Sequence, residues 1–173
     1  MGSLPPEVAA EVDRRQASMV ARARGRVLDL GRPEARDLLR AAASARADGV
    51  SWDAASRYDT VVDPAVLVHE PDLARAVGGL VALLADDGEL LLVEPVLRPG
   101  LMALVVASIG SSLPAVRGLH VSRDVVGALR AAGLTAADVE RFEVATPAWP
   151  LRHLVEVRAV RIPRRAPASE EAA

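Results

Sequence analysis

The sequence predicts an α/β protein with a mainly parallel sheet, and two observations carry this expectation. Short apolar segments with the character of strands alternate with longer amphipathic segments along most of the 173 residues. One of these strands, at 89–95 (ELLLVEP), contains a continuous apolar run, which is typical of a parallel sheet covered on both faces. Aromatic residues make up only 2% of the chain, so the core is expected to consist of Val, Leu and Ala.

The first part of the chain is predicted to form a helix, a strand and a second helix. Apolar residues recur at roughly helical spacing over 6–23. The segment 26–30 (RVLDL) is expected to be a short buried strand that ends at Gly31. Pro33 suits the first turn of a helix over 33–47, because a proline there loses no intrahelical hydrogen bond.

A second strand is predicted at 58–62 (YDTVV), and a helix follows from Pro71. The residues Asp-Asp-Gly at 86–88 predict a turn before the apolar strand 89–95.

The C-terminal part is predicted to hold one more helix and two strands. Ser122 is a candidate N-cap for the helix, which Gly133 ends. Alternating segments at 139–145 and 151–160 indicate a closing pair of strands. This order predicts a Rossmann-like sheet with helices on both faces, an antiparallel C-terminal strand and fewer strands than usual.

The length fits one domain, which we expect over 25–162, after an N-terminal helix in 1–24 and before a flexible tail at 163–173. The net charge of −2 gives no basic face for nucleic acid. All 21 basic residues are arginine, which is typical of a GC-rich bacterial genome. The absence of cysteine excludes disulfides, zinc knuckles and thiol nucleophiles, and no metal site is predicted.

Two further features bear on localisation and partners. The first residues lack the apolar core of a signal peptide, which predicts a cytoplasmic protein. The apolar stretch within 98–118 is too short and too interrupted to span a bilayer. We expect it either to cover a lipophilic substrate or to form a dimer face.

Three segments in order resemble the class I S-adenosylmethionine-dependent methyltransferases. VLDLG at 27–31 resembles the first motif of that family, and 58–95 resembles a later strand, helix and strand. Residues 119–160 resemble the C-terminal part of the subgroup that methylates quinones and small lipophiles. The resemblance implies S-adenosylmethionine as cofactor, a small apolar molecule as substrate, and the strand that precedes Gly31 in the middle of the sheet.

The chain departs from the family pattern in two places. Where the family turn repeats glycine at every second position, this chain has Gly-Arg-Pro-Glu-Ala at 31–35. Pro33 removes an amide and the other side chains enter the cofactor's space, at a cost on the order of a few kcal/mol, or roughly a hundredfold in affinity. Only 27 residues, 31–57, separate the first two strands, so about two strands of the family sheet are expected to be missing.

The resemblance implies four residues on the cofactor side. Asp29 and Gly31 correspond to the strand-end acid and the first glycine of the cofactor turn. The alternative for Asp29 is that it only caps or hydrogen-bonds the tight turn. Asp53 corresponds weakly to the acid beside the adenine. Asp63 stands at a strand tip where the family makes polar contacts, and it suits a simple turn acid as well.

His69 and His120 are the candidate catalytic residues, because a histidine with a pKa near neutral can act as a general base. The alternative for both is a hydrogen bond within a loop. Glu94, at the end of the apolar strand, either contacts substrate or anchors the loop that follows.

Two functions stay open, and whether the chain is an enzyme stays open with them. One is methyl transfer to a small apolar molecule. The other is a non-catalytic relative that has lost or weakened cofactor binding and serves as a binding or dimerisation module, as a homodimer or beside an active methyltransferase. A domain for another nucleotide is less favoured, because the turn also lacks the dinucleotide glycine pattern.

Overall fold

The computed structural model describes residues 3–50, 53, 56–97 and 117–161. Of the predicted segments, most of the apolar stretch 98–118 and the tail 163–173 lie outside these residues. The elements in chain order are α1 (Pro6–Arg22), β1 (Val27–Asp29), α2 (Pro33–Ala47), β2 (Tyr58–Pro64), the short 3-10 helix η2 (Leu67–His69), α3 (Leu73–Leu83), β3 (Leu84–Pro95), α5 (Val125–Ala131), β4 (Leu134–Glu143), the 3-10 helix η5 (Trp149–Leu151) and β5 (His153–Arg161).

The strands form one open sheet in the order β1-β2-β3-β5-β4. β1, β2 and β3 pair in parallel, and β5 runs antiparallel to both of its neighbours, β3 and β4. β4 therefore points in the same direction as the first three strands, and β5 alone opposes them. This confirms the predicted Rossmann-like, mainly parallel sheet with an antiparallel C-terminal strand.

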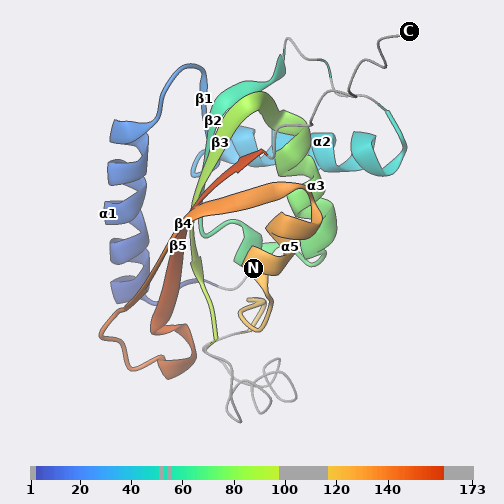
Figure 1. Cartoon of the computed structure of the whole chain (residues 1–173). Coiled ribbons are helices and arrows are strands. Elements are labelled where there is room, and N and C mark those ends of the chain that lie inside the picture. Colours follow the sequence, from blue (N-terminus) through green and yellow to red (C-terminus); the bar gives the residue numbers. More distant parts are fainter. Residues whose placement is uncertain (1–2, 51–52, 54–55, 98–116, 162–173) are drawn as a thin grey trace, which may run out of the picture.

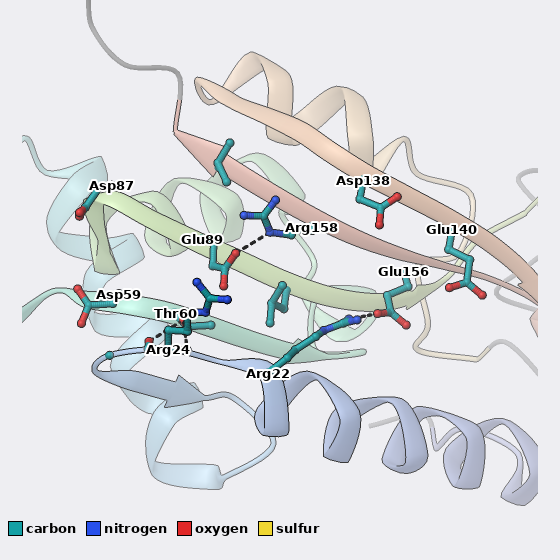
Figure 2. Close-up of a pocket in the computed structure, with 13 residues that line it drawn as sticks. Arg22, Arg24, Asp59, Thr60, Asp87, Glu89, Asp138, Glu140, Glu156 and Arg158 are labelled. Atoms are coloured by element: carbon teal, nitrogen blue, oxygen red, sulfur yellow. Dashed lines mark hydrogen bonds and ion pairs between the residues drawn. The ribbon is translucent and has the colours of Figure 1, made fainter.

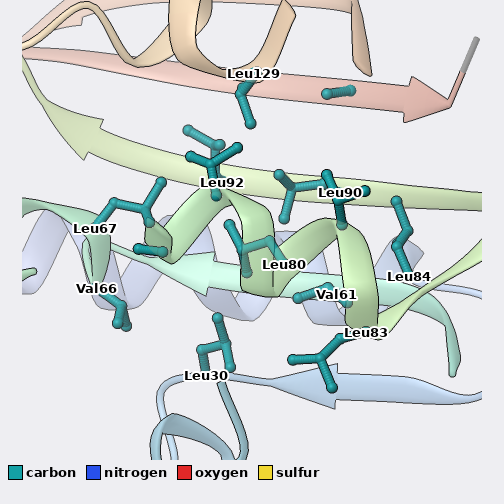
Figure 3. Packing of buried hydrophobic residues seen from close by; sticks show 14 of the residues in the cluster. Leu30, Val61, Val66, Leu67, Leu80, Leu83, Leu84, Leu90, Leu92 and Leu129 are labelled. Atoms are coloured by element: carbon teal, nitrogen blue, oxygen red, sulfur yellow. The ribbon is translucent and has the colours of Figure 1, made fainter. Parts of the chain in front are cut away.

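Helices cover both faces of the sheet (Figure 1). On one face, α2, α3 and α5 bury a leucine-rich cluster against β2 and β3, to which α2 contributes Leu39. Leu80, from α3, and Leu129, from α5, belong to the same cluster (Figure 3). On the other face, α1 packs against β2 and β3 through a second cluster. Side chains alternate along a strand, so Val61 faces the first cluster and Val62 the second.

α2 and α3 lie against each other at a glycine. A Cβ on Gly79 would lie 2.9 Å from the Cβ of Ala43 and 3.0 Å from the carbonyl oxygen of Leu39. Such distances leave no room for a side chain, so the glycine sets how closely the two helices approach.

The position of β1 differs from the expectation. The segment 26–30 was predicted to be buried in the middle of the sheet, but β1 is an edge strand, and Val27 is 38% exposed. The reason is that 31–57 contains α2 and no strand among its described residues, so nothing in the described chain pairs with the outer edge of β1.

This shortening also changes the topology. The chain passes from β1 to β2 to β3 in one direction across the sheet, and both crossover helices, α2 and α3, lie on the same face. Among the strands that the structure describes, the order therefore does not reverse beside β1.

Three local predictions need correction. β3 continues through 86–88, where a turn was predicted, because a register shift against β2 accommodates these residues within the strand. The cap of α5 is Asp124, whose side chain accepts from the Gly127 amide, and not Ser122. β4 starts at Leu134, directly after Gly133 at φ +88°, and so five residues earlier than predicted. Among the described residues, no helix has the length and apolar character needed to cross a membrane.

Candidate functional site

The candidate site lies where β1, β2 and β3 end at one rim of the sheet, since ligands of open α/β sheets bind beyond the carboxyl ends of the strands. This rim carries Asp29, Asp63 and Glu94, one acid from each strand.

Asp29 and Gly31 form a turn, and side chains of the same protein occupy the space beside it. The side-chain amide of Gln16, from α1, donates to both carboxylate oxygens of Asp29 at 2.8 and 2.9 Å, and the Gly31 amide donates to one of them at 2.9 Å. A Cβ on Gly31 would lie 2.3 Å from the Gln16 nitrogen. Arg36 donates to the carbonyl oxygen of Leu30 at 2.8 Å. The space beside the glycine therefore holds protein side chains.

A groove of about 440 Å³ runs along the free edge of β1, between α1 and α2. The side chains of Arg32 and Glu34 at its border are exposed, and neither has a hydrogen bond or ion pair within the described residues. We call it the β1-edge groove, and it is lined by Val20, Val27, Leu28, Asp29, Arg32, Glu34, Ala35, Leu38 and Tyr58.

Asp63 and Glu94 are both fully buried and bind consecutive amides of the loop after β2. One oxygen of Asp63 accepts from the Val66 amide at 2.8 Å. The two oxygens of Glu94 accept from the amides of Leu67 and Val68 at 2.8 and 3.0 Å. Both acids therefore hold η2 in place. For Asp63 this contact corresponds to the turn-acid alternative, whereas Glu94 binds the loop after β2 and not the loop that follows it in the chain, which neither alternative for Glu94 anticipated.

Burial governs the ionisation of this pair. Removal from water raises the pKa of Asp63 to about 7, although the hydrogen bond from the Val66 amide acts to lower it. Burial, together with the charge of Asp63, raises the pKa of Glu94 well above its usual value. The second oxygen of Asp63 is buried without a hydrogen-bond partner, whereas both oxygens of Glu94 accept amides. The second oxygen of Asp63 can therefore carry a proton without the loss of an amide hydrogen bond, which neither oxygen of Glu94 can do.

His69 and His120 come together at η2, since the backbone amide of His120 donates to the carbonyl oxygen of Val68 at 2.8 Å. Burial, followed by the charge of Arg36, lowers the pKa of His69, and the Nδ1 atom of His69 is buried without a partner among the described residues. Burial, followed by the charge of Arg123, lowers the pKa of His120. Both rings are therefore neutral at pH 7.

Asp53 lies apart from the other predicted residues. It is exposed and belongs to the connection between the C-terminal end of α2 and the start of β2, at the end of the sheet opposite the rim. The structure therefore brings Asp29, Gly31, Asp63 and the two histidines to one rim, but does not bring Asp53 there.

Sequence reasoning missed three residues at the rim, namely Gln16, Arg36 and Arg123. Arg123 donates to the carbonyl oxygens of Glu70 and Pro71 at 2.6 and 3.1 Å. All three side chains act on backbone or side-chain atoms of other elements, and nothing in their local sequence signals this.

A larger depression, about 640 Å³, lies at the opposite end of the sheet and on the face that carries α1 (Figure 2). Its walls are charged: Arg158 pairs with Glu89 at 2.6 Å, and Arg22 pairs with Glu156. It contains none of the predicted site residues. Among the described residues, no three His, Cys, Asp or Glu side chains gather as a metal site would need.

The comparisons with known proteins identify the fold. No protein-family model and no curated protein sequence matches the chain. Solved structures do match, among them a putative sarcosine dimethylglycine methyltransferase from Galdieria sulphuraria (TM-score 0.56, 11% identity, 94% of this chain and 92% of that chain covered). A SAM-dependent methyltransferase from Thermotoga maritima has a TM-score of 0.53 and 15% identity, with 90% and 92% covered. The cyclase SpnF has a TM-score of 0.51 and 16% identity, with 88% and 80% covered.

The chain thus has the fold of the class I S-adenosylmethionine-dependent methyltransferases, in a shortened form. Sequence identities of 11–16% establish a common fold only. A fold by itself does not determine which reaction a protein catalyses.

Proposed function

We propose that this chain is a non-catalytic relative of the small-molecule methyltransferases, in which binding of S-adenosylmethionine is lost and the fold serves as a binding and dimerisation module. The observation that carries this proposal is the strand order. Nucleotide ligands of open α/β sheets lie in the crevice where the strand order reverses. From β1 to β3 the order runs in one direction, with both crossover helices on one face, so the described strands form no such crevice beside β1.

The turn after β1 supports the same proposal. In a cofactor-binding turn, free amides at a helix start meet the anionic end of the ligand. Here Pro33 supplies no amide, Gln16 lies against Gly31, and the Asp29 carboxylate is already bound by Gln16 and by the Gly31 amide. These residues do not fit the amino-acid end of S-adenosylmethionine.

The second candidate is an active methyltransferase on a small apolar molecule, and one observation favours it. His69 and His120 lie together at the rim with lowered pKa values, so each is a neutral base that could take a proton from an acceptor. Methyl transfer itself depends chiefly on alignment of donor and acceptor.

Thermal unfolding with S-adenosylmethionine and S-adenosylhomocysteine separates the two candidates. Ligand at a hundred times its dissociation constant stabilises a protein by about 2.7 kcal/mol, which for a chain of this size is roughly 5–10 °C in Tm. The proposal predicts no shift at 1 mM of either compound. A shift of this size would overturn it in favour of the enzyme.

Two variants test whether the turn after β1 alone accounts for the proposed loss of cofactor binding. Pro33→Gly combined with Ala35→Gly restores the glycine spacing of the turn, and Pro71→Gly is the matched control for losing a proline elsewhere. Because the topology is unchanged, we expect the double variant to remain without a ligand-induced shift. If it gains one, the turn alone accounts for the loss of binding.

A further inference from the structure

The turn between β2 and η2, residues 64–68, contains a strained backbone position. Ala65 has a φ of +57°, and among the described residues it is the single residue other than glycine with a positive φ. A residue with a Cβ atom disfavours this left-handed conformation, so the conformation persists only where neighbouring contacts impose it. Ala65 is buried, and its amide donates to the carbonyl oxygen of Val93 at 2.8 Å. The strain therefore lies inside the protein, in a turn that is tied to β3.

Two buried carboxyls hold this turn, and we call Asp63 and Glu94 the acid pair. Together they accept the amides of the three residues that follow Ala65, at 2.8, 2.8 and 3.0 Å. Both side chains are fully buried, and the second oxygen of Asp63 has no partner among the described residues. The side chains that keep the turn in its strained form are thus also the ones that have been removed from water.

Within the described residues, no positively charged side chain is bonded to the acid pair. Burial raises the pKa of both carboxyls, an effect that Arg36, from α2, opposes at Asp63 and that Arg123, before α5, opposes at Glu94. Both guanidinium groups, however, donate to backbone carbonyl oxygens. Glu70, after η2, further raises the pKa of Asp63. A proton on the free oxygen of Asp63 therefore removes one of two buried like charges and leaves all three amide bonds in place.

The turn also positions both candidate histidines. His69 is the last residue of η2, and the carbonyl oxygen of Val68 accepts from the His120 amide at 2.8 Å. Val66 and Leu67 pack in the leucine-rich cluster (Figure 3), and Val68 packs in the cluster on the other face of the sheet. Opening of the turn would therefore move the histidines and expose apolar side chains at the rim.

We propose that the β2–η2 turn is a pH-sensitive switch, which is closed while the acid pair holds a proton and opens more often once that proton has left. In the open form both carboxylates are hydrated, Ala65 leaves the left-handed region, and the contact between Val68 and His120 is broken. The rim is thus closed in acid and opens increasingly towards neutral pH. This inference goes beyond the proposed function, and it applies whether or not S-adenosylmethionine binds.

The direction of the pH effect follows from the protons bound in each form. In the open turn the Asp63 carboxyl lies in water and titrates near pH 3.9, whereas burial in the closed turn raises its pKa to about 7. Between these values opening releases a proton, so the opening equilibrium rises about tenfold for each pH unit and levels off above pH 7. His69 acts with the opposite sign, because burial lowers its pKa and its protonation at low pH favours the open form. A variant that lacks only the Asp63 carboxyl isolates the effect of the acid.

Amide hydrogen exchange on the full chain, followed residue by residue by NMR, tests whether the turn opens by itself. The amides of Val66, Leu67 and Val68 report on the turn, and those of Leu91 and Leu92 report on β3 in the interior of the sheet. At pH 7, after correction for intrinsic exchange rates, we expect the turn amides to be protected at least roughly tenfold less than the β3 amides. Equal protection of the two sets would mean that the turn opens only when the whole protein unfolds, and this would overturn the inference. The comparison needs no variant.

The same measurement on Asp63→Asn tests the role of the acid. Asparagine does not titrate and keeps an oxygen for the Val66 amide. From pH 5 to pH 7 the protection of the turn amides should fall about a hundredfold more in the wild type than in this variant. Ala65→Gly is the matched control in the same turn, because it keeps the acid pair and should retain the wild-type pH dependence. The inference is overturned if wild type and Asp63→Asn respond alike to pH, or if Ala65→Gly loses the response as well.

Discussion

Replacing Asp63 by Asn should change how the stability of the protein depends on pH. Asp63 is fully buried, and burial raises the pKa of its carboxyl to about 7. In the unfolded chain the same group titrates near its ordinary value of about 3.9. Between these two values the folded protein holds a proton that the unfolded chain has released.

The magnitude follows from this difference in bound protons. The free energy of unfolding falls by about 1.4 kcal/mol for each pH unit in the window where only the folded state is protonated. The stabilisation is complete below about pH 4, decreases from there to about pH 7, and is absent above pH 7. From pH 5 to pH 8 the Asp63 carboxyl therefore removes roughly 3 kcal/mol. Asparagine has no such titration and keeps an oxygen for the Val66 amide.

Urea unfolding at pH 5 and at pH 8, followed by circular dichroism, measures the effect. The loss of stability between the two pH values should be smaller in Asp63→Asn than in the wild type by roughly 3 kcal/mol. Asp138→Asn, at an exposed acid whose side chain has no hydrogen bond or ion pair in the described chain, is the control and should follow the wild type. If Asp63→Asn also follows the wild type, the folded protein does not hold this proton on Asp63.

Two further predictions concern packing and capping, both measured by urea unfolding. Gly79→Ala should destabilise by about 1–3 kcal/mol, because its Cβ would press on Ala43. The methyl group added by Gly78→Ala would contact only the flexible side chain of Arg46, so this variant should be neutral or stabilising by up to about 1 kcal/mol. Equal effects of the two substitutions would contradict the close contact between α2 and α3 at Gly79. Asp124→Ala should lower the free energy of unfolding by about 1 kcal/mol through loss of the cap of α5, whereas Ser122→Ala should leave it unchanged. A larger loss of stability in Ser122→Ala than in Asp124→Ala would show that Ser122 is the cap after all.

Most helices and strands, and their order along the chain, could be predicted from the sequence, because hydrophobic periodicity and turn residues are properties of short stretches of chain. The helix predicted at 33–47 has those bounds in the structure, and the antiparallel C-terminal strand pairs beside β3. The position of β1 in the sheet could not be predicted from the sequence. Its segment has the apolar character of a buried strand, yet its edge position depends on which other strands exist.

The site was predicted only in part for the same reason. Asp63 was predicted at a strand tip, and it lies near the end of β2, at the rim. His69 and His120 were both candidate catalytic residues, and a backbone hydrogen bond joins the segments that carry them. The hydrogen bond from Gln16 to Asp29 joins α1 to the end of β1 through side chains alone, and no local sequence pattern predicts it. Asp53 was placed with them on a match of a few residues, which carries little information about position.

The most direct test of the central claim is a calorimetric titration of the wild-type chain with S-adenosylhomocysteine, which occupies the nucleotide site of methyltransferases without needing a methyl acceptor. Because the described strands show no reversal of order beside β1 and Gln16 lies against Gly31, we expect no heat of binding up to 1 mM ligand. Saturable binding at one ligand per chain, with a dissociation constant in the micromolar range, would contradict the account.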